Sequence, residues 1–149
     1  IVFDFDGVFT DNKVLTDSDG KEYVRADRGD GLGIARLREQ KIPMLVLSTE
    51  ENPVTAARCD KLELECQHGV ADKAARLKEI LKERGISAEN TLYVGNDIND
   101  AGCLELVGFP IIVADAHPAV HNGANLVLTR NGGDGAVREL CELILTQST

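Results

Sequence analysis

The chain has 149 residues, of which 43% are hydrophobic and 28% are charged, and this length and composition predict one globular domain over residues 1–149. The formal net charge of −9 argues against a nucleic-acid partner, which would favour a basic surface. No run approaches the roughly 18 consecutive apolar residues that a membrane-spanning helix needs, and the opening residues lack the features of a secretory signal, so we expect a cytoplasmic protein with no membrane partner.

Short runs rich in β-branched and aliphatic residues alternate with helical patterns along the chain. The runs lie at residues 1–5, 44–47, 91–94 and 110–113. Helices are expected after Asp30-Gly31, at residues 54–62 and at residues 73–84, where Gly85 closes the last of them. This alternation predicts an α/β, Rossmann-like three-layer fold, in which helices cover both faces of a central parallel sheet.

Two segments depart from this alternation. Residues 13–25 are typical of a small β-hairpin, because two β-rich runs flank the turn Asp17-Ser18-Asp19-Gly20. We expect this hairpin to be too small to cover an active site. Residues 131–135 contain three glycines and are expected to form a flexible link before a last amphipathic helix, which runs from Ala136 to about Leu145.

The sequence Asp4-Phe5-Asp6-Gly7 places two carboxylates directly after the first apolar run. Because side chains alternate along an extended strand, both carboxylates point to the same side if the strand stays extended. Two like charges this close are unfavourable unless a divalent cation or a phosphoryl group organises them. A solvated turn is the alternative, since Asp-Gly is a common turn pair.

Three further residues lie where a phosphoryl-transfer site would need them. Ser48 and Thr49 follow the second apolar run and can donate hydrogen bonds to phosphate oxygens, although either could simply cap a helix. Lys73 begins a helix and could neutralise a phosphate and a carboxylate together, although a lone lysine is usually solvated.

The loop from Gly95 to Asp100 follows the third apolar run and is dense in oxygen ligands. It contains Asn96 and Asp97, which are the kinds of side chain that bind hard cations such as Mg²⁺. Such loops also occur as plain helix caps, and Asp100 could serve in that way. The occurrence of four such elements in chain order favours the functional interpretation.

The order DxDGxxxD, then Ser/Thr, then Lys, then GNDxxD resembles the haloacid dehalogenase superfamily of phosphatases, over essentially the whole chain. The resemblance implies that Asp4 attacks phosphorus to form an aspartyl-phosphate, and that Asp6 acts as general acid and base. It implies that Ser48 and Lys73 hold the phosphoryl group. An in-line displacement needs these parts: an anionic nucleophile, shielding of the phosphoryl charge and a proton for the leaving alkoxide.

The resemblance also implies Mg²⁺ as cofactor, bound by Asp4, the backbone carbonyl of Asp6 and the amide oxygen of Asn96. Superfamily members commonly have Asp where Asn96 stands, directly after the loop glycine. Asp97 and Asp100 are included in the expected catalytic set because they restore negative charge nearby. Because Asn96 is neutral, we expect weaker metal affinity rather than none.

Larger superfamily members carry a cap domain, for which this chain has no room. The hairpin, the stretch from Arg28 to Gly33 and the C-terminal segment resemble the capless 3-deoxy-D-manno-octulosonate 8-phosphate phosphatases and their nonulosonate 9-phosphate relatives. The resemblance implies a homotetramer in which the hairpins join into a central barrel. It also implies a small phosphorylated substrate, a 2-keto-3-deoxy sugar acid phosphate.

The octulosonate phosphatases usually have Thr-Gly-Arg after the second strand, whereas this chain has Ser-Thr-Glu at residues 48–50. Glu50 together with Lys61 resembles the nonulosonate and sialic-acid-type phosphatases, in which Glu50 would bind hydroxyl groups and Lys61 a carboxylate. A solvated pair on a helix is the alternative for these two residues. The expected substrate contacts are Gly31, Thr49, Glu50, Arg58 and Lys61.

The alternative function is a non-catalytic oligomerisation or regulatory module, like the phosphatase-like domain of some acylneuraminate cytidylyltransferases. The neutral Asn96 favours this alternative. A purely structural module has no evident need for two facing carboxylates and a lysine, so the enzyme is preferred. Phosphate transfer to an acceptor other than water ranks last, because it would normally need a cap to exclude solvent.

Overall fold

A computed structural model describes residues 1–147 of the chain. Its centre is a six-stranded parallel sheet with the strand order β5-β4-β1-β6-β7-β8. The strands are β1 (Val2–Phe3), β4 (Leu45–Leu47), β5 (Glu65–Gln67), β6 (Leu92–Gly95), β7 (Phe109–Ile112) and β8 (Leu126–Val127). The predicted α/β fold with a central parallel sheet is therefore confirmed.

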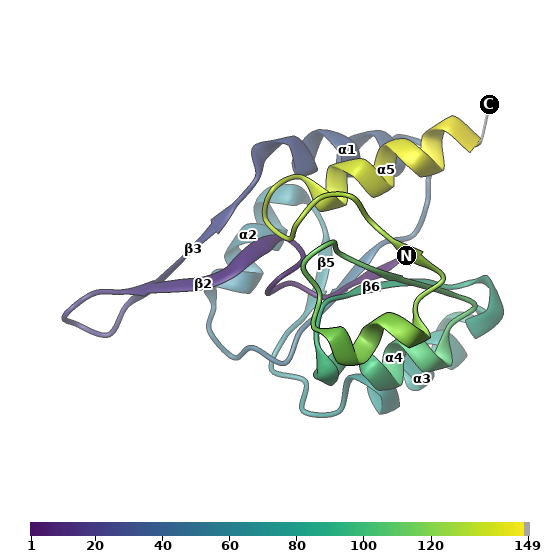
Figure 1. Cartoon of the computed structure of the whole chain (residues 1–149), viewed down its shortest axis with the longest axis horizontal. Coiled ribbons are helices and arrows are strands. Elements are labelled where there is room, and N and C mark those ends of the chain that lie inside the picture. The colour runs from purple at the N-terminus through teal and green to yellow at the C-terminus, as the bar shows by residue number, and fades with distance from the viewer. Residues whose placement is uncertain (148–149) are drawn as a thin grey trace.

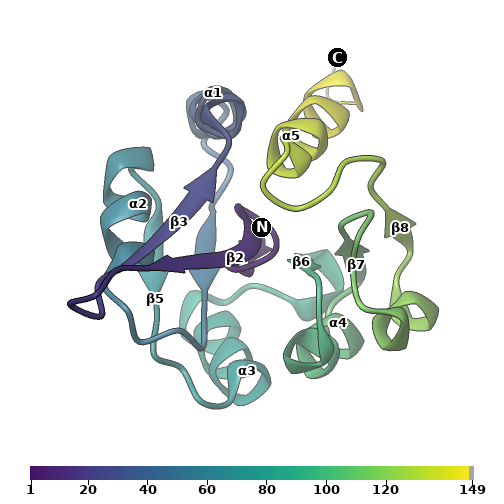
Figure 2. The ribbon, with the colours of Figure 1, turned by 60° about the vertical axis from the view of Figure 1, so that its left-hand side comes forward.

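Helices cover both faces of this sheet, as predicted (Figures 1 and 2). One face carries α1 (Arg28–Glu39), α2 (Val54–Leu62) and α5 (Ala136–Gln147), and the other carries α3 (Lys73–Arg84) and α4 (Ala101–Leu106). Short 3-10 helices occupy Ala88–Asn90, Ile98–Asp100 and Pro118–Gly123. The described residues contain no cap domain, and no helix among them is both long and apolar enough to cross a bilayer.

Three elements were missed in the sequence, because they are short and lack a clear apolar pattern. The strand β5 is three residues long and polar at its first and last positions, and β8 has only two residues, both exposed. Both strands lie at the edges of the sheet, where a strand has a neighbour on one side only and fewer of its residues need to be apolar. The helix α4 has six residues, too few to show a helical period.

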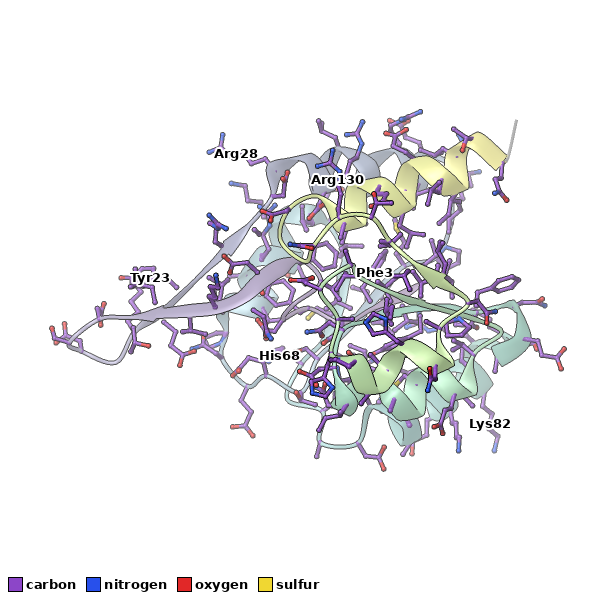
Figure 3. All side chains as sticks on the ribbon, viewed as in Figure 1. Phe3, Tyr23, Arg28, His68, Lys82 and Arg130 are labelled. Carbon is purple, nitrogen blue, oxygen red and sulfur yellow. The ribbon has the colours of Figure 1, made fainter. Side chains whose placement is uncertain are left out.

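The predicted hairpin is formed by β2 (Thr10–Thr16) and β3 (Glu22–Ala26), which pair antiparallel and project from the body (Figure 1). Its turn is closed by Asp17, whose carboxylate accepts hydrogen bonds from the backbone amides of Asp19 and Lys21 at 3.0 and 2.9 Å. The side chain of Tyr23 lies on this arm, whereas Phe3 of β1 lies inside the body (Figure 3).

The hairpin leaves the body at the end where the parallel strands have their carboxyl termini. His68 follows directly after β5 and lies toward this end, whereas Lys82, near the end of α3, lies at the opposite end (Figure 3). Side chains that follow β1, β4 and β6 therefore gather below the base of the hairpin, which is the position expected for a functional site in a parallel sheet.

The helix α1 begins earlier than the sequence suggested, at Arg28 rather than after Asp30-Gly31. Asp27 caps it, since its carboxylate accepts a hydrogen bond from the backbone amide of Gly29 at 2.6 Å. The glycines within the helix allow close packing, because a Cβ atom at Gly33 would lie 2.8 Å from the Cβ atom of Cys141 in α5. The helices α1 and α5 lie side by side for this reason (Figures 1 and 2).

The glycine-rich segment at 131–135 differs from the flexible link that we expected. A Cβ atom at Gly132 would lie 1.9 Å from the carbonyl oxygen of Gly7, and the amide of Gly133 donates a hydrogen bond to the carbonyl of Val8 at 3.1 Å. Gly132 also donates to the carboxylate of Asp115 at 2.9 Å. Both glycines are buried and held against the loop that follows β1, because only a residue without a side chain fits there.

Asp30 joins α1 to the amino-terminal end of α5. Its Oδ1 atom accepts a hydrogen bond from the backbone amide of Arg138 at 2.9 Å, whereas Oδ2 is buried without a hydrogen-bond partner. Burial raises the pKa of Asp30 from its ordinary value of 3.8 to about 7, against the opposing effects of the Arg138 amide and the guanidinium groups of Arg58 and Arg130. The folded protein therefore holds this proton to higher pH than the unfolded chain.

We expect Asp30→Asn to be more stable than the wild type at pH 8, by about 1–3 kcal/mol. Between about pH 4 and pH 7 the Asp30 carboxyl ionises in the unfolded chain but stays protonated in the folded protein. The free energy of unfolding of the wild type therefore falls as the pH rises through this range, and it keeps its full value only below about pH 4. Asparagine keeps an acceptor for the Arg138 amide and has no proton to lose. Urea unfolding of both proteins at pH 5 and pH 8 measures the effect. If the variant's free energy of unfolding does not gain on that of the wild type between these pH values, the prediction is contradicted.

Candidate active site

Asp4 and Asp6 line one cavity, as their alternation with Phe5 suggested. Phe5 points the other way and stacks on Phe9, with ring centroids 5.9 Å apart, and this aromatic pair anchors the loop in the core. The backbone amide of Asp4 continues the sheet by donating a hydrogen bond to the carbonyl of Val94 at 2.9 Å. Core packing therefore holds the backbone that carries both carboxylates.

Lys73 lies between two carboxylates that come from different strands. Its Nζ atom lies 2.9 Å from Asp4 Oδ1 and 2.7 Å from Asp100 Oδ1, and its side chain is 0% exposed. Asp100 is fully buried as well, and it also accepts hydrogen bonds from the hydroxyl of Tyr93 at 2.6 Å and from the backbone amide of Asn96 at 2.8 Å. Asp100 therefore connects Lys73 to the loop after β6.

These contacts shift the pKa values of the buried groups. Burial raises the pKa of Asp4 to about 7, and the nearby Asp100 adds to the rise, while Lys73 opposes it. Burial alone would lower the pKa of Lys73, but Asp4 and Asp100 outweigh it and the pKa rises. Lys73 therefore stays cationic, and its charge supports the ionised form of the carboxylate beside it.

Asp6 is less buried than Asp4 and faces other acidic groups. Burial raises its pKa, and the charges of Glu50 and Glu22 add to the rise, while a hydrogen bond from Thr10 opposes it. The hydroxyl of Thr10 lies 3.4 Å from Asp6 Oδ1 and also accepts hydrogen bonds from the amides of Gly7 and Asn12. Thr10 fixes the turn beneath Asp6, a role that the sequence did not reveal.

Ser48, Thr49 and Glu50 follow β4 and line the same cavity. The side chain of Ser48 is buried, and its hydroxyl oxygen accepts a hydrogen bond from the backbone amide of Glu50 at 3.1 Å. The hydroxyl proton of Ser48 is then free to point into the cavity, where it can donate to an anion. The structure thus brings this second motif to the two aspartates, as the order of the strands requires.

Asn96 and Asp97 bring the loop after β6 to the same cavity. The buried side chain of Asn96 packs against Gly7, where a Cβ atom would lie 2.0 Å from its amide nitrogen, and the φ angle of Gly7 is +85°. Gly7 is therefore required both for its backbone angle and for the space that Asn96 fills. Asp97 caps the short helix at Ile98–Asp100 by accepting a hydrogen bond from the amide of Ile98 at 2.7 Å.

The amide group of Asn96 can serve the aspartates in two ways. One of its terminal atoms lies 3.1 Å from Asp4 Oδ2 and 3.0 Å from the carbonyl oxygen of Asp6. If this atom is the nitrogen, it donates a hydrogen bond to each of those oxygens. If it is the oxygen, its distances to the other two oxygens are close to the about 2.9 Å expected between neighbouring ligands of octahedral Mg²⁺. The residues present therefore fit Mg²⁺.

Mg²⁺ would rely here on mixed donors, namely one carboxylate, one backbone carbonyl and one amide oxygen. Within residues 1–147, no group of three or more histidine, cysteine, aspartate and glutamate side chains is placed to hold a metal ion. Hard cations bind carbonyl and amide oxygens as well as carboxylates, so a site of this composition suits Mg²⁺ better than a transition metal.

The cavity has a volume of about 260 Å³ and includes residues that the sequence did not point to. These are Asn12, Val14, Glu22 and Val24 of the hairpin, together with Val54 and Asn99. The hairpin was expected only to be too small to cover the site, and the structure adds that its base forms one wall. The strand alternation that places Glu22 and Val24 on one face of β3 could have signalled this.

Gly31, Arg58 and Lys61 lie elsewhere in the single chain. They line a second cavity of about 430 Å³ between α1 and α2, together with Arg28 and Arg38. Arg58 donates a hydrogen bond to the carbonyl of Asp27 at 3.2 Å, while its Nε atom is buried without a partner. Of the five expected substrate contacts, the structure brings only Thr49 and Glu50 to the cavity that holds Asp4.

Comparisons with known proteins agree with this geometry. A family model described as haloacid dehalogenase-like hydrolase matches residues 40–140. The 3-deoxy-D-manno-octulosonate 8-phosphate phosphatase of Haemophilus influenzae is 34% identical over 146 residues, which cover 97% of this chain and 81% of that protein. The family model covers Ser48, Lys73 and the loop after β6, and the match to the Haemophilus influenzae phosphatase covers nearly the whole chain.

Solved structures share the fold closely. A protein of Streptomyces avermitilis that is assigned to the same hydrolase family superposes with a TM-score of 0.95 and 54% identity, over 99% of this chain and 84% of that one. The octulosonate phosphatase of Moraxella catarrhalis, crystallised with a magnesium ion, a phosphate ion and 3-deoxy-D-manno-octulosonate, superposes with a TM-score of 0.93 and 29% identity, over 97% and 84% of the two chains.

We expect Asn96→Asp to bind Mg²⁺ more tightly than the wild type, by about tenfold, because a charged ligand replaces a neutral one. Without metal the variant should unfold at a lower temperature, because a carboxylate beside Asp4 Oδ2 repels where the amide nitrogen could donate. Titration calorimetry with Mg²⁺ and thermal unfolding with and without Mg²⁺ measure the two effects.

Asn99→Asp is the matched control, since it adds the same charge to the same loop away from the converging oxygens. Equal changes in Mg²⁺ affinity in both variants, or no change in Asn96→Asp, would show that Asn96 is not a ligand.

Proposed function

Because the chain belongs to the haloacid dehalogenase-like hydrolases and is a magnesium-dependent phosphatase, we propose that it hydrolyses a 2-keto-3-deoxy sugar acid phosphate through an aspartyl-phosphate intermediate. The observation that carries this proposal is the buried carboxylate of Asp4, 2.9 Å from the ammonium group of Lys73 and in one cavity with Asp6, Ser48 and Asn96. The octulosonate phosphatases similar to this chain support the substrate class.

In the first step, a carboxylate oxygen of Asp4 attacks phosphorus and the bond between phosphorus and the sugar oxygen breaks. Asp6 donates its proton to the departing oxygen, and its raised pKa suits a group that must be protonated before this step. The hydroxyl of Ser48 binds a phosphoryl oxygen, while Lys73, which does not line the cavity, holds the attacking carboxylate of Asp4 in its ionised form. Asp4, the Asp6 carbonyl and Asn96 would hold Mg²⁺, which would supply positive charge that shields the phosphoryl group from the carboxylates.

In the second step, Asp6 takes a proton from water, and the water oxygen attacks phosphorus. The bond between phosphorus and Asp4 breaks, so inorganic phosphate leaves and the carboxylate is restored. Asp100 does not line the cavity, and its role is to position Lys73. Asp97 lines the cavity and adds negative charge beside the proposed Mg²⁺ site. A non-catalytic module would have no need for the carboxylate of Asp6 and the hydroxyl of Ser48 in one cavity with Asp4.

The distribution of charge supports a sugar acid as substrate. The cavity that holds Asp4 is lined by five carboxylates, those of Asp4, Asp6, Glu22, Glu50 and Asp97, and by no lysine or arginine among the described residues. A substrate carboxylate would be repelled there. The second cavity is lined by arginines and Lys61 without an acidic residue, so we propose that Gly31, Arg58 and Lys61 form the part that receives this carboxylate.

Helix α2 contributes residues to both cavities. Val54, in the first turn of this helix, lines the acidic cavity, whereas Arg58 and Lys61, one and two turns further on, line the basic one. An extended sugar acid of eight or nine carbon atoms has the length to place a phosphate at one end and a carboxylate at the other, about 10 Å apart, which is two helical turns.

We propose a homotetramer assembled through the hairpins. Val14, Leu15 and Tyr23 are apolar side chains on this projecting arm and are 54%, 71% and 44% exposed. Exposed apolar side chains gathered on a projecting arm favour association with further copies.

We expect Asp4→Asn to reduce phosphate release by roughly a thousandfold or more, because the amide cannot attack phosphorus. Asp6→Asn should lose about a hundredfold to ten-thousandfold, because no proton reaches the leaving oxygen. Phosphate release from 3-deoxy-D-manno-octulosonate 8-phosphate and from 2-keto-3-deoxynonulosonate 9-phosphate, with Mg²⁺ or with a chelator, measures both effects. Asp19→Asn in the hairpin turn is the control, and activity that survives Asp4→Asn with an intact fold would refute the mechanism.

The assembly has a separate test. The wild type should elute at about four times its chain mass of 16.1 kDa, and Leu15→Asp should shift it to smaller species, because a charge replaces apolar contact. Phe109→Asp is the control, since Phe109 is 53% exposed at the start of β7, away from the hairpin. A wild type that elutes as a monomer would refute the tetramer and leave the chemistry untouched.

A further inference from the structure

We propose that Glu22 of the hairpin is a specificity-determining residue, which accepts hydrogen bonds from hydroxyl groups of the substrate together with Glu50. This inference rests on the proposed function and deepens it, because it names the part of the substrate that the hairpin wall recognises. Glu22 begins β3, and it lines the same cavity as Ser48. The sequence motifs of the site do not include it.

Asn52 holds both glutamates in place. Its backbone amide donates a hydrogen bond to Glu50 Oε1 at 2.8 Å, and its side-chain nitrogen donates to Glu22 Oε2 at 3.1 Å. One residue thus ties the hairpin to the loop after β4 and orients two carboxylates that come from these two segments. Each glutamate keeps a second oxygen that no hydrogen bond within residues 1–147 uses.

The free oxygens lie in surroundings that favour hydroxyl donors. No lysine or arginine among the described residues lines this cavity, so neither glutamate serves in an ion pair there. Both glutamates line the same cavity as Asp4 and Asp6, so their carboxylates share the space in which the phosphate reacts. An ionised carboxylate is an acceptor only, and hydrogen bonds from hydroxyl groups to it are stronger than those to a neutral acceptor.

The same arrangement opposes other ligands. A second anionic group near the phosphate would meet Glu22 and Glu50 at close range and would be repelled. Glu22 therefore selects in two ways, since it binds hydroxyl groups close to the phosphate and rejects a carboxylate at that position. A phosphate ester with several hydroxyl groups next to the phosphorylated carbon satisfies both conditions, whereas 2-phosphoglycolate satisfies neither.

Glu22→Ala tests this proposal through substrate selectivity. The measured quantity is kcat/KM for a sugar acid phosphate, such as 3-deoxy-D-manno-octulosonate 8-phosphate, divided by kcat/KM for p-nitrophenyl phosphate, which has no hydroxyl group on its leaving part. We expect this ratio to fall at least tenfold, mainly through a higher KM for the sugar acid phosphate. Glu22→Gln keeps one acceptor oxygen and should lie between the wild type and Glu22→Ala.

Asn52→Ala should lower the same ratio by a smaller factor, because it frees both glutamates without removing them. Glu51→Gln is the matched control, since Glu51 is an exposed neighbour that does not line the cavity, and it should leave the ratio unchanged. A purely structural role of Glu22 would lower both kcat/KM values together and leave the ratio near that of the wild type, which would overturn the proposal.

Glucitol 6-phosphate separates this inference from the proposed function. It carries several hydroxyl groups and no carboxylate, so its ratio to p-nitrophenyl phosphate reports hydroxyl binding alone. If the wild type hydrolyses glucitol 6-phosphate but no sugar acid phosphate, the proposed substrate class fails, while a fall of this ratio in Glu22→Ala still supports the role of Glu22. If the ratio is the same in the wild type and in Glu22→Ala, the role of Glu22 is refuted whichever substrate is physiological.

Discussion

The ammonium group of Lys73 lies 2.9 Å from Asp4 and 2.7 Å from Asp100, in a place that water does not reach. Each partner depends on the others, because a buried charge without an opposite charge would cost several kcal/mol. Asp4 follows β1, Asp100 follows β6 and Lys73 begins α3, so this ion triad fixes the relative positions of three elements. The loop that carries Asn96 is fixed with them, since Asp100 also accepts its backbone amide.

The acidity of the cavity follows from this arrangement and limits its use. The single positive charge of Lys73 offsets one of the two negative charges of Asp4 and Asp100, and it does not contact Asp6, Glu22, Glu50 or Asp97. A phosphate ester carries up to two negative charges, so it can enter only when a divalent cation compensates these carboxylates. The dependence on Mg²⁺ is therefore a property of the whole cavity and not only of the three oxygens that converge near Asn96.

The sequence predicted the parallel sheet and most of the catalytic motifs, because these depend on local patterns. Apolar runs mark buried strands, and the carboxyl ends of neighbouring parallel strands must meet at one edge. Contacts between distant segments were not predictable in this way. Glu22 belongs to an exposed hairpin, and only the fold brings it opposite Glu50. Likewise Arg58 and Lys61 were expected among the substrate contacts, but the sequence did not reveal that they line a cavity separate from that of Asp4. Nor does a helical pattern reveal that Asp30 joins α1 to α5.

The close contact between Gly132 and the carbonyl of Gly7 has a consequence for the folding rate. The loop with Asp4 and Asp6 is separated by more than a hundred residues from the glycines that support its back. Bringing two such distant segments together costs more loop-closure entropy than pairing neighbouring elements. The support behind the two aspartates therefore depends on a contact of high sequence separation, and contacts of this kind slow folding.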